Sequence, residues 1–353
     1  MRKTLMGVGA CLLFVLTACT KDCLRCVEVY GDEATIYLDD AGSSAEVREA
    51  ILDADSKGVV SYTVIGSAAR VGLSSNPFAD TRVESLDLKS VTSWPARAIP
   101  GAYFYGESFP CLENVILPDE VQSIGRSAFY HCDRLKNVEG TNVTNIEDGA
   151  FLGCADLQSA VFPNVITLGS NVFSHCISLV SAEMPELRTT GNNTFDSCTS
   201  LKSIDFPKLE VAYLSFCFAC TGLEFVNLPS ARKIEGDAFS MCSSLKDIYV
   251  PEARYVSGFL ACTSLTRLSL QNVNDLGNIG FSETPLEYLE LSASGNITYG
   301  EYTFANSLQP FASENCVLVL NADKRPGGGC TPVADPETNT WAGVRWKQIL
   351  FAD

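Results

Sequence analysis

The stretch AFLGCADLQSAVFP, residues 150–163, decides the fold of this chain because it recurs. VFSHCISLVSAEMP follows at residues 172–185 and TFDSCTSLKSIDFP at residues 194–207, each twenty-two residues further on. The unit reads AF-x-x-C-x-x-L-x-x-I-x-(L/F/V)-P and continues into a second short apolar stretch. A unit this short cannot enclose a core, so it must bury its apolar face against the next copy, as solenoids do.

Each unit contains one short strand with a single buried face. In LKSIDFP, residues 201–207, the leucine, isoleucine and phenylalanine point to one side, while Ser203 and Asp205 point to the other. The proline ends the strand and turns the chain. Successive strands are expected to pair in parallel about 4.8 Å apart, so that equivalent residues form ladders along the molecule.

One cysteine per unit forms such a ladder. Its members are Cys132, Cys154, Cys176, Cys198, Cys220, Cys242 and Cys262. Each lies three residues after a phenylalanine, replaced once by Cys217, and three before a leucine, so a small buried thiol suits this tight turn. Disulfides between neighbouring coils are the alternative, but an odd number of parallel thiols cannot all pair. Catalysis by one of seven equivalent cysteines is the least favoured interpretation.

The unit SIGRSAFYHCDRLKNV, residues 123–138, resembles the leucine-rich repeats of the BspA-like family, also called the Treponema pallidum type. The resemblance covers about residues 83–320. It implies an α/β repeat solenoid, a right-handed and curved leucine-rich-repeat coil with short parallel strands. It also implies a place on the surface of gut or oral Bacteroidetes, where some relatives bind host or bacterial surfaces. The family offers no shared catalytic residues.

The first residues resemble a lipoprotein signal peptide, predicted over 1–18. Two basic residues precede a short apolar run that ends in LTAC, where Cys19 would carry the lipid. The following TKD partly matches the surface-export signal of Bacteroidetes lipoproteins. We therefore expect a lipidated tether over 19–32 and an outer membrane lipoprotein exposed on the cell surface, which contacts the membrane only through its lipid. An ordinary secretion signal cut near Ala18 is the alternative.

Both ends of the repeat are predicted to carry caps. A small α/β N-terminal cap is expected over 33–82, with Ser44 as the N-cap of the helix in SSAEVREAILDAD. The solenoid follows over 83–320, and its insertion at 89–111 is expected to loop over one face. The strand CVLVLNAD should be the last of the sheet, before a C-terminal cap over 321–353. The side chains expected to cover the exposed edge are Trp341, Trp346, Ile349 and Phe351.

Two cysteine pairs lie outside the ladder. Cys316 and Cys330 bracket a glycine-rich loop, where a disulfide is compatible with secretion. Cys23 and Cys26 form a C-x-x-C sequence in the tether, interpreted as a disulfide or as free thiols because the βαβ context of a redox motif is missing. Whether either disulfide forms stays open.

Charge and motifs both favour a non-enzymatic protein. The formal net charge is −17, or −19 once Arg2 and Lys3 are removed, so the chain should repel nucleic acid and anionic headgroups. The sequence contains no hydrolase, phosphate-loop or dinucleotide-binding motif. His131 and His175 precede ladder cysteines and are expected to face solvent, without a second ligand at zinc-like spacing. We expect no catalytic residue, cofactor or metal site; calcium binding by the acidic surface stays open.

The outward positions of the strands provide the candidate binding face. Small and acidic residues occupy them in the N-terminal half, and aromatic and charged residues appear toward the C-terminal half. The candidate binding residues are Phe225, Asp247, Tyr249, Arg267 and Tyr288. Exposed aromatics beside charges favour a binding surface, although strands also accept aromatics for their β-propensity.

These features predict a non-enzymatic, lipid-anchored leucine-rich-repeat protein of the cell surface. Its partner would be a protein or glycan ligand on host or bacterial surfaces, and no nucleic acid partner is expected. The alternative is a structural or assembly component of the cell envelope that faces the periplasm. The partial export signal favours surface display.

Overall fold

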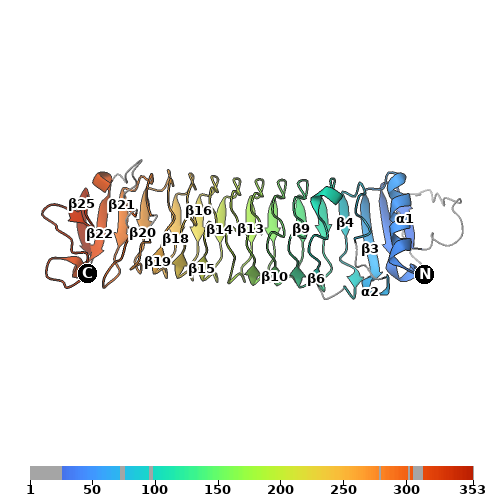
Figure 1. Ribbon diagram of the computed structural model, residues 1–353, viewed down its shortest axis with the longest axis horizontal. Coiled ribbons are helices and arrows are strands. Elements are labelled where there is room, and N and C mark those ends of the chain that lie inside the picture. The colour runs from blue at the N-terminus through green and yellow to red at the C-terminus, as the bar shows by residue number, and fades with distance from the viewer. Residues whose placement is uncertain are drawn as a thin grey trace, which may run out of the picture.

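The computed structural model describes residues 26–71, 76–94, 98–277, 280–300, 303–304 and 313–352. These residues stack as successive coils along one long axis, with the N-terminal helix at one end and the C-terminal strands at the other (Figure 1). Most coils present two short strands, and equivalent strands of neighbouring coils pair in parallel. The predicted solenoid of short parallel strands is confirmed.

The first strand of each coil belongs to a long file of parallel strands. Its members are β4 Ser85–Asp87, β7 Asn114–Ile116, β9 Asn137–Glu139, β11 Ser159–Val161, β13 Ser181–Glu183, β14 Ser203–Asp205, β16 Phe225–Asn227, β18 Asp247–Tyr249, β20 Arg267–Ser269, β21 Tyr288–Leu291, β22 Val317–Asn321 and β25 Gln348–Ala352. Equivalent residues pair, with Ser159 opposite Ser181 and Ser203 opposite Phe225. The repeat therefore places equivalent side chains side by side.

The second strand of each coil contributes to a shorter file on the other side. Its members are β5 Val91–Thr92, β6 Ala98–Ile99, β8 Ser123–Ile124, β10 Asn145–Ile146, β12 Thr167–Leu168, β15 Val211–Ala212, β17 Lys233–Ile234 and β19 Tyr255–Val256. β6, β8, β10 and β12 form one parallel sheet, and β15, β17 and β19 form another. The core lies between the two files.

A column of phenylalanine rings fills this core. Its members are Phe104, Phe129, Phe151, Phe173, Phe195, Phe239, Phe259, Phe281 and Phe304. Phe129 and Phe151 stack with centroids 5.0 Å apart and planes 7° apart, and Phe151 and Phe173 with centroids 5.3 Å apart and planes 2° apart. Where Cys217 replaces phenylalanine, the neighbouring Phe216 turns its ring edge-on between Phe195 and Phe239. The column therefore continues through the substitution.

A left-handed residue precedes every ladder cysteine. The positive φ angles belong to His131, Gly153, His175, Ser197, Ala219, Met241 and Ala261. This conformation turns the backbone N–H toward the next coil: His131 donates to the carbonyl of Leu152 at 2.8 Å, and Gly153 donates to that of Ser174 at 2.9 Å. Only Gly153 adopts this backbone conformation without the usual steric cost, because glycine has no Cβ.

The N-terminal cap contains β1 Val27–Tyr30, β2 Glu33–Tyr37, the 3₁₀ turn η2 Leu38–Asp40, α1 Ser44–Ser56, β3 Ser61–Ser67 and α2 Ala68–Val71. β1 pairs antiparallel with β2, so the cap begins before residue 33, within the segment predicted as a tether. The N-cap of α1 is Ser43 rather than Ser44. Its hydroxyl accepts from the N–H of Glu46, whose carboxylate accepts from Gly42, so the pair satisfies two donors at the helix start.

The insertion at 89–111 does not loop over a face. It contributes β5, β6 and the 3₁₀ turn η4 Gly106–Ser108, and it buries Trp94 and Phe104 in the core. Phe104 stacks on Phe129 with centroids 4.8 Å apart, so the segment is a coil of its own. Its aromatic residues line the core because the phenylalanine column begins here.

The C-terminal end is built differently from the prediction. β22 is followed in the sheet by β25, which contains Ile349 and Phe351, so CVLVLNAD is not the last strand. Trp341, in the hairpin of β23 Thr340–Trp341 and β24 Val344–Arg345, and Trp346, which follows it, pack against Phe304. The Asn339 side chain accepts from the backbone N–H of Ile349 at 3.2 Å and thereby occupies a donor of the edge strand.

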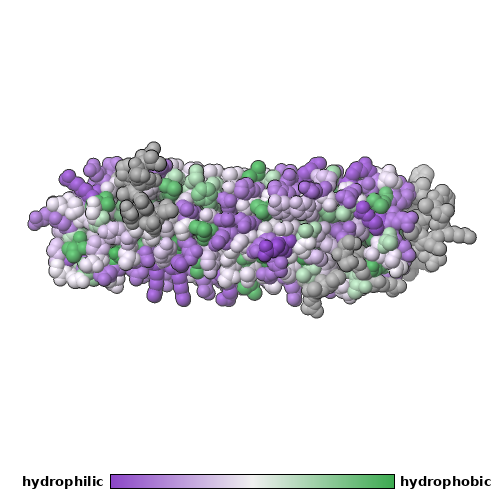
Figure 2. Space-filling view, viewed as in Figure 1, coloured by the Kyte–Doolittle hydropathy of each residue, from purple (hydrophilic) through white to green (hydrophobic). Residues whose placement is uncertain are grey.

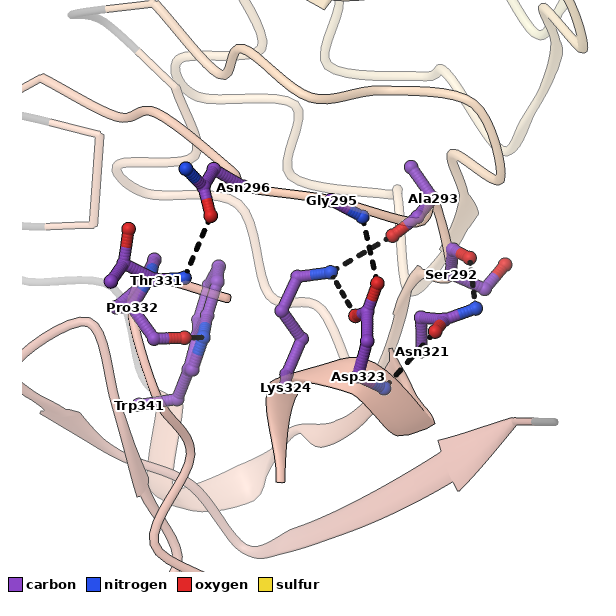
Figure 3. A network of polar contacts seen from close by, with 10 residues as sticks. All are labelled: Ser292, Ala293, Gly295, Asn296, Asn321, Asp323, Lys324, Thr331, Pro332 and Trp341. Atoms are coloured by element: carbon purple, nitrogen blue, oxygen red, sulfur yellow. Dashed lines mark hydrogen bonds and ion pairs between the residues drawn. The ribbon is translucent and has the colours of Figure 1, made fainter. Parts of the chain in front are cut away.

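An ion pair between a buried lysine and a half-buried aspartate fastens the C-terminal segment to the preceding coil (Figure 3). Lys324, in the 3₁₀ turn η6 Ala322–Lys324, is fully buried and donates to Asp323 at 2.6 Å and to the Ala293 carbonyl at 3.0 Å. The Asp323 carboxylate also accepts from the N–H of Gly295 at 2.7 Å. We call Asp323 and Lys324 the C-terminal latch. The 3₁₀ turn η5 Ser313–Asn315 lies just before β22.

Polar side chains dominate the visible surface, and apolar residues form scattered small patches in this view (Figure 2). Among the described residues, no helix has the length and apolar character needed to cross a bilayer.

Candidate functional site

The outward side chains of the first file form one exposed sheet face. In each three-residue strand the middle residue is buried, as with Val226 in β16 and Ile248 in β18, so the first and third residues point away from the core. In-register pairing aligns these positions into two columns along the molecule. All five candidate binding residues lie in these columns.

The candidate residues divide into two groups. Arg267 and Tyr288 are paired in register on β20 and β21, and the guanidinium carbon lies 4.3 Å from the centre of the tyrosine ring. Partial burial, followed by the nearby Glu290 carboxylate, raises the pKa of the Tyr288 hydroxyl. The Tyr288 ring already has a cationic partner, so this pair is satisfied within the protein.

Phe225, Asp247 and Tyr249 make up the other group, on β16 and β18. Phe225 is opposite Asp247, and Tyr249 is opposite Asn227, so the two rings occupy one diagonal and the two polar groups the other. Phe225 is 39% exposed and Tyr249 is 54% exposed. We call Phe225, Asn227, Asp247 and Tyr249 the sheet quartet.

Asn227 was missed as a site residue because its side chain gives no chemical signal in the sequence. Its amide donates to the Asp205 carboxylate at 2.8 Å, which fixes the amide against the neighbouring strand. The strand register identifies Asn227 as part of the surface, because it lies opposite the exposed Tyr249. Within the described chain, no hydrogen bond or ion pair engages the Asp247 carboxylate.

The N-terminal half of the sheet face is mostly small or acidic, with the exposed Val161 between Glu139 and Glu183. Glu139, Glu183 and Asp205 share one column, and serines occupy the other column on β11, β13 and β14. Beside the sheet quartet, Lys246 lies 2.7 Å from Glu224 and lowers the pKa of that carboxyl. The face is therefore negative in its N-terminal half.

The ladder cysteines are structural in the described chain. All seven are buried free thiols. Each donates to the backbone carbonyl at the phenylalanine position of the preceding coil, over 2.6–3.2 Å. This repeated geometry agrees with the interpretation of the ladder as parallel buried thiols, and not with disulfides between neighbouring coils.

Burial also makes these thiols poor nucleophiles. It raises the pKa of Cys154, Cys176 and Cys198, and it raises that of Cys262 to about 12. The thiolate is the reactive form of cysteine, so these groups stay protonated at neutral pH.

Thr284 continues the ladder where the sequence loses its cysteine. Its hydroxyl donates to the Phe259 carbonyl, twenty-five residues upstream, as Cys176 does to Phe151. Sequence reasoning looked for a thiol and missed it, although a hydroxyl is an equivalent donor.

The two cysteines near the C-terminus are unlinked. Cys316 is buried, and burial raises the pKa of its thiol to about 12, while the Cys330 thiol bonds to the Asp323 carboxylate. Cys26 is buried in the cap. Its predicted neighbour Cys23 lies outside the described residues, as do the predicted lipid site Cys19 and the export signal.

The histidines are exposed, as predicted. His131 lies 3.3 Å from Asp133, and His175 lies 2.9 Å from the Ser174 hydroxyl. In the part of the chain that the structure describes, no three His, Cys, Asp or Glu side chains gather as a metal site requires.

A shallow polar groove of about 590 Å³ lies away from the sheet quartet. Its lining residues are Asp119, Glu120, Gln122, Asn142, Thr144, Asn164, Ile166 and Glu186. Several of these side chains already have structural partners: Asn142 and Asn164 donate to backbone carbonyls, and Glu186 pairs with Lys208. The groove is therefore part of the turns that connect the two files.

The match to a family model agrees with this architecture. A model of the BspA type leucine rich repeat region matches residues 97–212, 144–257 and 255–313. A Treponema pallidum leucine-rich repeat protein, TpLRR, is 21% identical, with a TM-score of 0.43 over 63% of this chain and 87% of that one. A leucine-rich repeat protein from Bacteroides ovatus is 18% identical, with a TM-score of 0.44 over 85% and 86%. No curated protein sequence matches the chain.

Proposed function

The chain belongs to the BspA type leucine-rich repeat family, and from that premise we propose that it is a cell-surface binding protein. It would be held at the outer membrane by a lipid on Cys19 and would present its sheet face to a protein or glycan of host or bacterial surfaces. The observation that carries this proposal is the sheet quartet, which exposes two rings and an unpaired carboxylate on a regular scaffold.

The scaffold suits binding better than chemistry. Family and fold are typically those of non-enzymatic binding proteins. The thiols, the residues best suited to nucleophilic chemistry, are buried along the ladder and hydrogen-bonded to backbone. A parallel sheet, by contrast, fixes the backbone positions of many exposed side chains at once, so a partner binds them without the cost of ordering a loop.

The test of the proposal is the export signal. Replacing Lys21 and Asp22 with alanine should abolish surface display without changing the amount of lipidated protein, while Cys19→Ala should prevent lipidation itself. Antibody binding to intact cells measures display, and radiolabelled palmitate measures lipidation. Unchanged display in the Lys21→Ala, Asp22→Ala double variant would show that these two residues are not an export signal.

The alternative is a structural or assembly component of the envelope that faces the periplasm. It predicts lipidated protein that antibodies reach only after the outer membrane is opened. That result would contradict surface display.

A further inference from the structure

The sheet quartet alternates apolar rings with hydrogen-bonding groups. With strands about 4.8 Å apart and a rise of about 3.3 Å per residue, the diagonal from Phe225 to Tyr249 is about 8 Å between Cα atoms. Among the described residues, neither ring stacks on another ring or lies under a cation. The exposed parts of both rings, 39% of Phe225 and 54% of Tyr249, and the Asp247 carboxylate are therefore available to a ligand.

We propose that the sheet quartet binds the sugar rings of a neutral glycan. This inference rests on the proposed function, because it names the ligand class of the same face. A pyranose presents C–H groups on one face and hydroxyls around its rim. Aromatic faces attract polarised C–H groups, while the Asp247 carboxylate accepts and the Asn227 amide can exchange hydrogen bonds with rim hydroxyls.

The shape of the surface favours a glycan over a protein anchor. Protein hot spots are mostly Trp, Tyr and Arg side chains inserted into well-packed, desolvated pockets. The polar groove does not include a quartet residue, and the quartet side chains stand on an open sheet face, so a ligand would lie across β16 and β18. The C–H face of a pyranose chair can pack on an aromatic ring without a pocket, and the two polar groups beside the rings can reach the hydroxyls at its edge.

Charge selects a neutral sugar over an anionic one. Asp247 lies in the quartet, and Asp205 lies beside Asn227 on the adjoining strand. The two cations near the quartet are already engaged: Lys246, next to Asp247, pairs with Glu224, and Arg267 is stacked on Tyr288. With a formal net charge of −17 on the chain, sulfate, phosphate or uronate groups would be repelled.

Such a site binds weakly in one copy and strongly in many. Two rings and two polar groups on an open surface bury little of a ligand, so a millimolar dissociation constant is expected. Many copies in one membrane that meet a repeating polysaccharide would gain avidity without any new contact.

The test uses the detergent-solubilised full chain, with neutral oligosaccharides of glucose, mannose and galactose as probes and oligogalacturonate as the anionic comparison. Titration calorimetry should find millimolar binding to a neutral series and none to oligogalacturonate. Tyr249→Ala and Phe225→Ala should each weaken binding about tenfold. Asp247→Asn, which keeps a hydrogen-bonding group, should weaken it less than Asp247→Ala.

The matched control is Tyr30→Ala, which removes a 60% exposed ring from the N-terminal cap. It should leave binding unchanged, and circular dichroism should show that every variant is folded. The proposal is overturned if no neutral oligosaccharide binds at millimolar concentration, or if binding survives loss of both rings. A salt-sensitive protein ligand that competes for the same face would overturn the glycan inference alone. Absence of surface display would instead contradict the proposed function.

Discussion

A single donor atom explains why cysteine recurs in this chain. In each coil the thiol occupies a buried turn that is too tight for a large side chain, and it donates to a carbonyl of the coil before. The contact links one coil to the next, so it acts as a small lateral hydrogen bond rather than as a reactive group. Thr284 makes the same bond with a hydroxyl, which shows that the position requires a small donor and not sulfur chemistry.

This account predicts how the thiols respond to alkylation. Without reductant, iodoacetamide should leave Cys154, Cys176 and Cys198 unmodified in the folded protein, because burial keeps them protonated and inaccessible. Once the protein is unfolded, all three should alkylate as free thiols in peptide mass spectrometry. Cys111 and Cys330, which are half-buried, serve as the internal control for reaction in the folded state. Disulfide-linked peptides between neighbouring ladder cysteines would contradict the account.

At the scale of elements, the phenylalanine column and the C-terminal latch stabilise the solenoid in different ways. Each fully buried phenylalanine contributes about 1.5–3 kcal/mol by leaving water, and ring contacts such as that of Phe151 with Phe173 add about 0.5–1.5 kcal/mol. The latch instead stabilises the C-terminal end of the stack through one ion pair.

The latch makes the C-terminal end sensitive to mutation and to acid. Asp323→Ala would leave the buried Lys324 ammonium without its carboxylate, at a cost of about 3–5 kcal/mol. Lys324→Met, which removes the charge together with its need for a partner, should cost less. Denaturation followed by the emission of Trp341 and Trp346, which lie in this end, measures both.

The Asp323 carboxylate also determines how the stability of the C-terminal end changes with pH. Burial opposes ionisation of Asp323, but hydrogen bonds from Lys324, Gly295 and Cys330 outweigh it and lower its pKa. The unfolded value is about 3.9. The stabilisation is therefore fully present above that pH and is lost as the pH falls through the lower folded value. An end that became more stable on acidification would contradict this role of Asp323.

The repeat itself was predictable, and its local adjustments were not. A twenty-two-residue period with a fixed Phe, Cys and Leu leaves one way to bury the apolar face, so strands, ladders and buried thiols followed from the sequence. Phe216 could not be predicted as a column member, because its ring reaches the core by an edge-on orientation and not by its place in the period.

The caps were predicted less well for a related reason. Outside the period, a residue's partner is set by three-dimensional packing. A lysine such as Lys324 reads as an exposed residue in the sequence, and only its contacts with Asp323 and Ala293 explain its burial. The segment after residue 321 resembled a cover for the edge, but its extended run Gln348–Ala352 pairs with β22 and becomes the edge strand itself. Among the candidate binding residues, only the register revealed that Arg267 and Tyr288 satisfy each other.

For the whole molecule, stability is close to a sum of coils and of their contacts with neighbours. Each coil contacts mainly the one before and the one after, so the length of the sheet face can vary without a change in the architecture. The caps protect the two ends of the stack, and the face between them keeps its side chains outward. This division leaves the sheet face free to serve as a binding surface.

The measurement that tests the central claim most directly is labelling of the sheet face on living cells. Glu183→Cys places a thiol at an exposed position of β13, and a membrane-impermeant maleimide should label it on intact cells as fully as after the outer membrane is opened. The wild-type chain, whose ladder thiols are buried, gives the background from its remaining cysteines, among them Cys111 and Cys330. Equal labelling before and after opening is the result that we predict. Labelling that appears only after opening would place the face inside the envelope and contradict a surface-displayed binding protein.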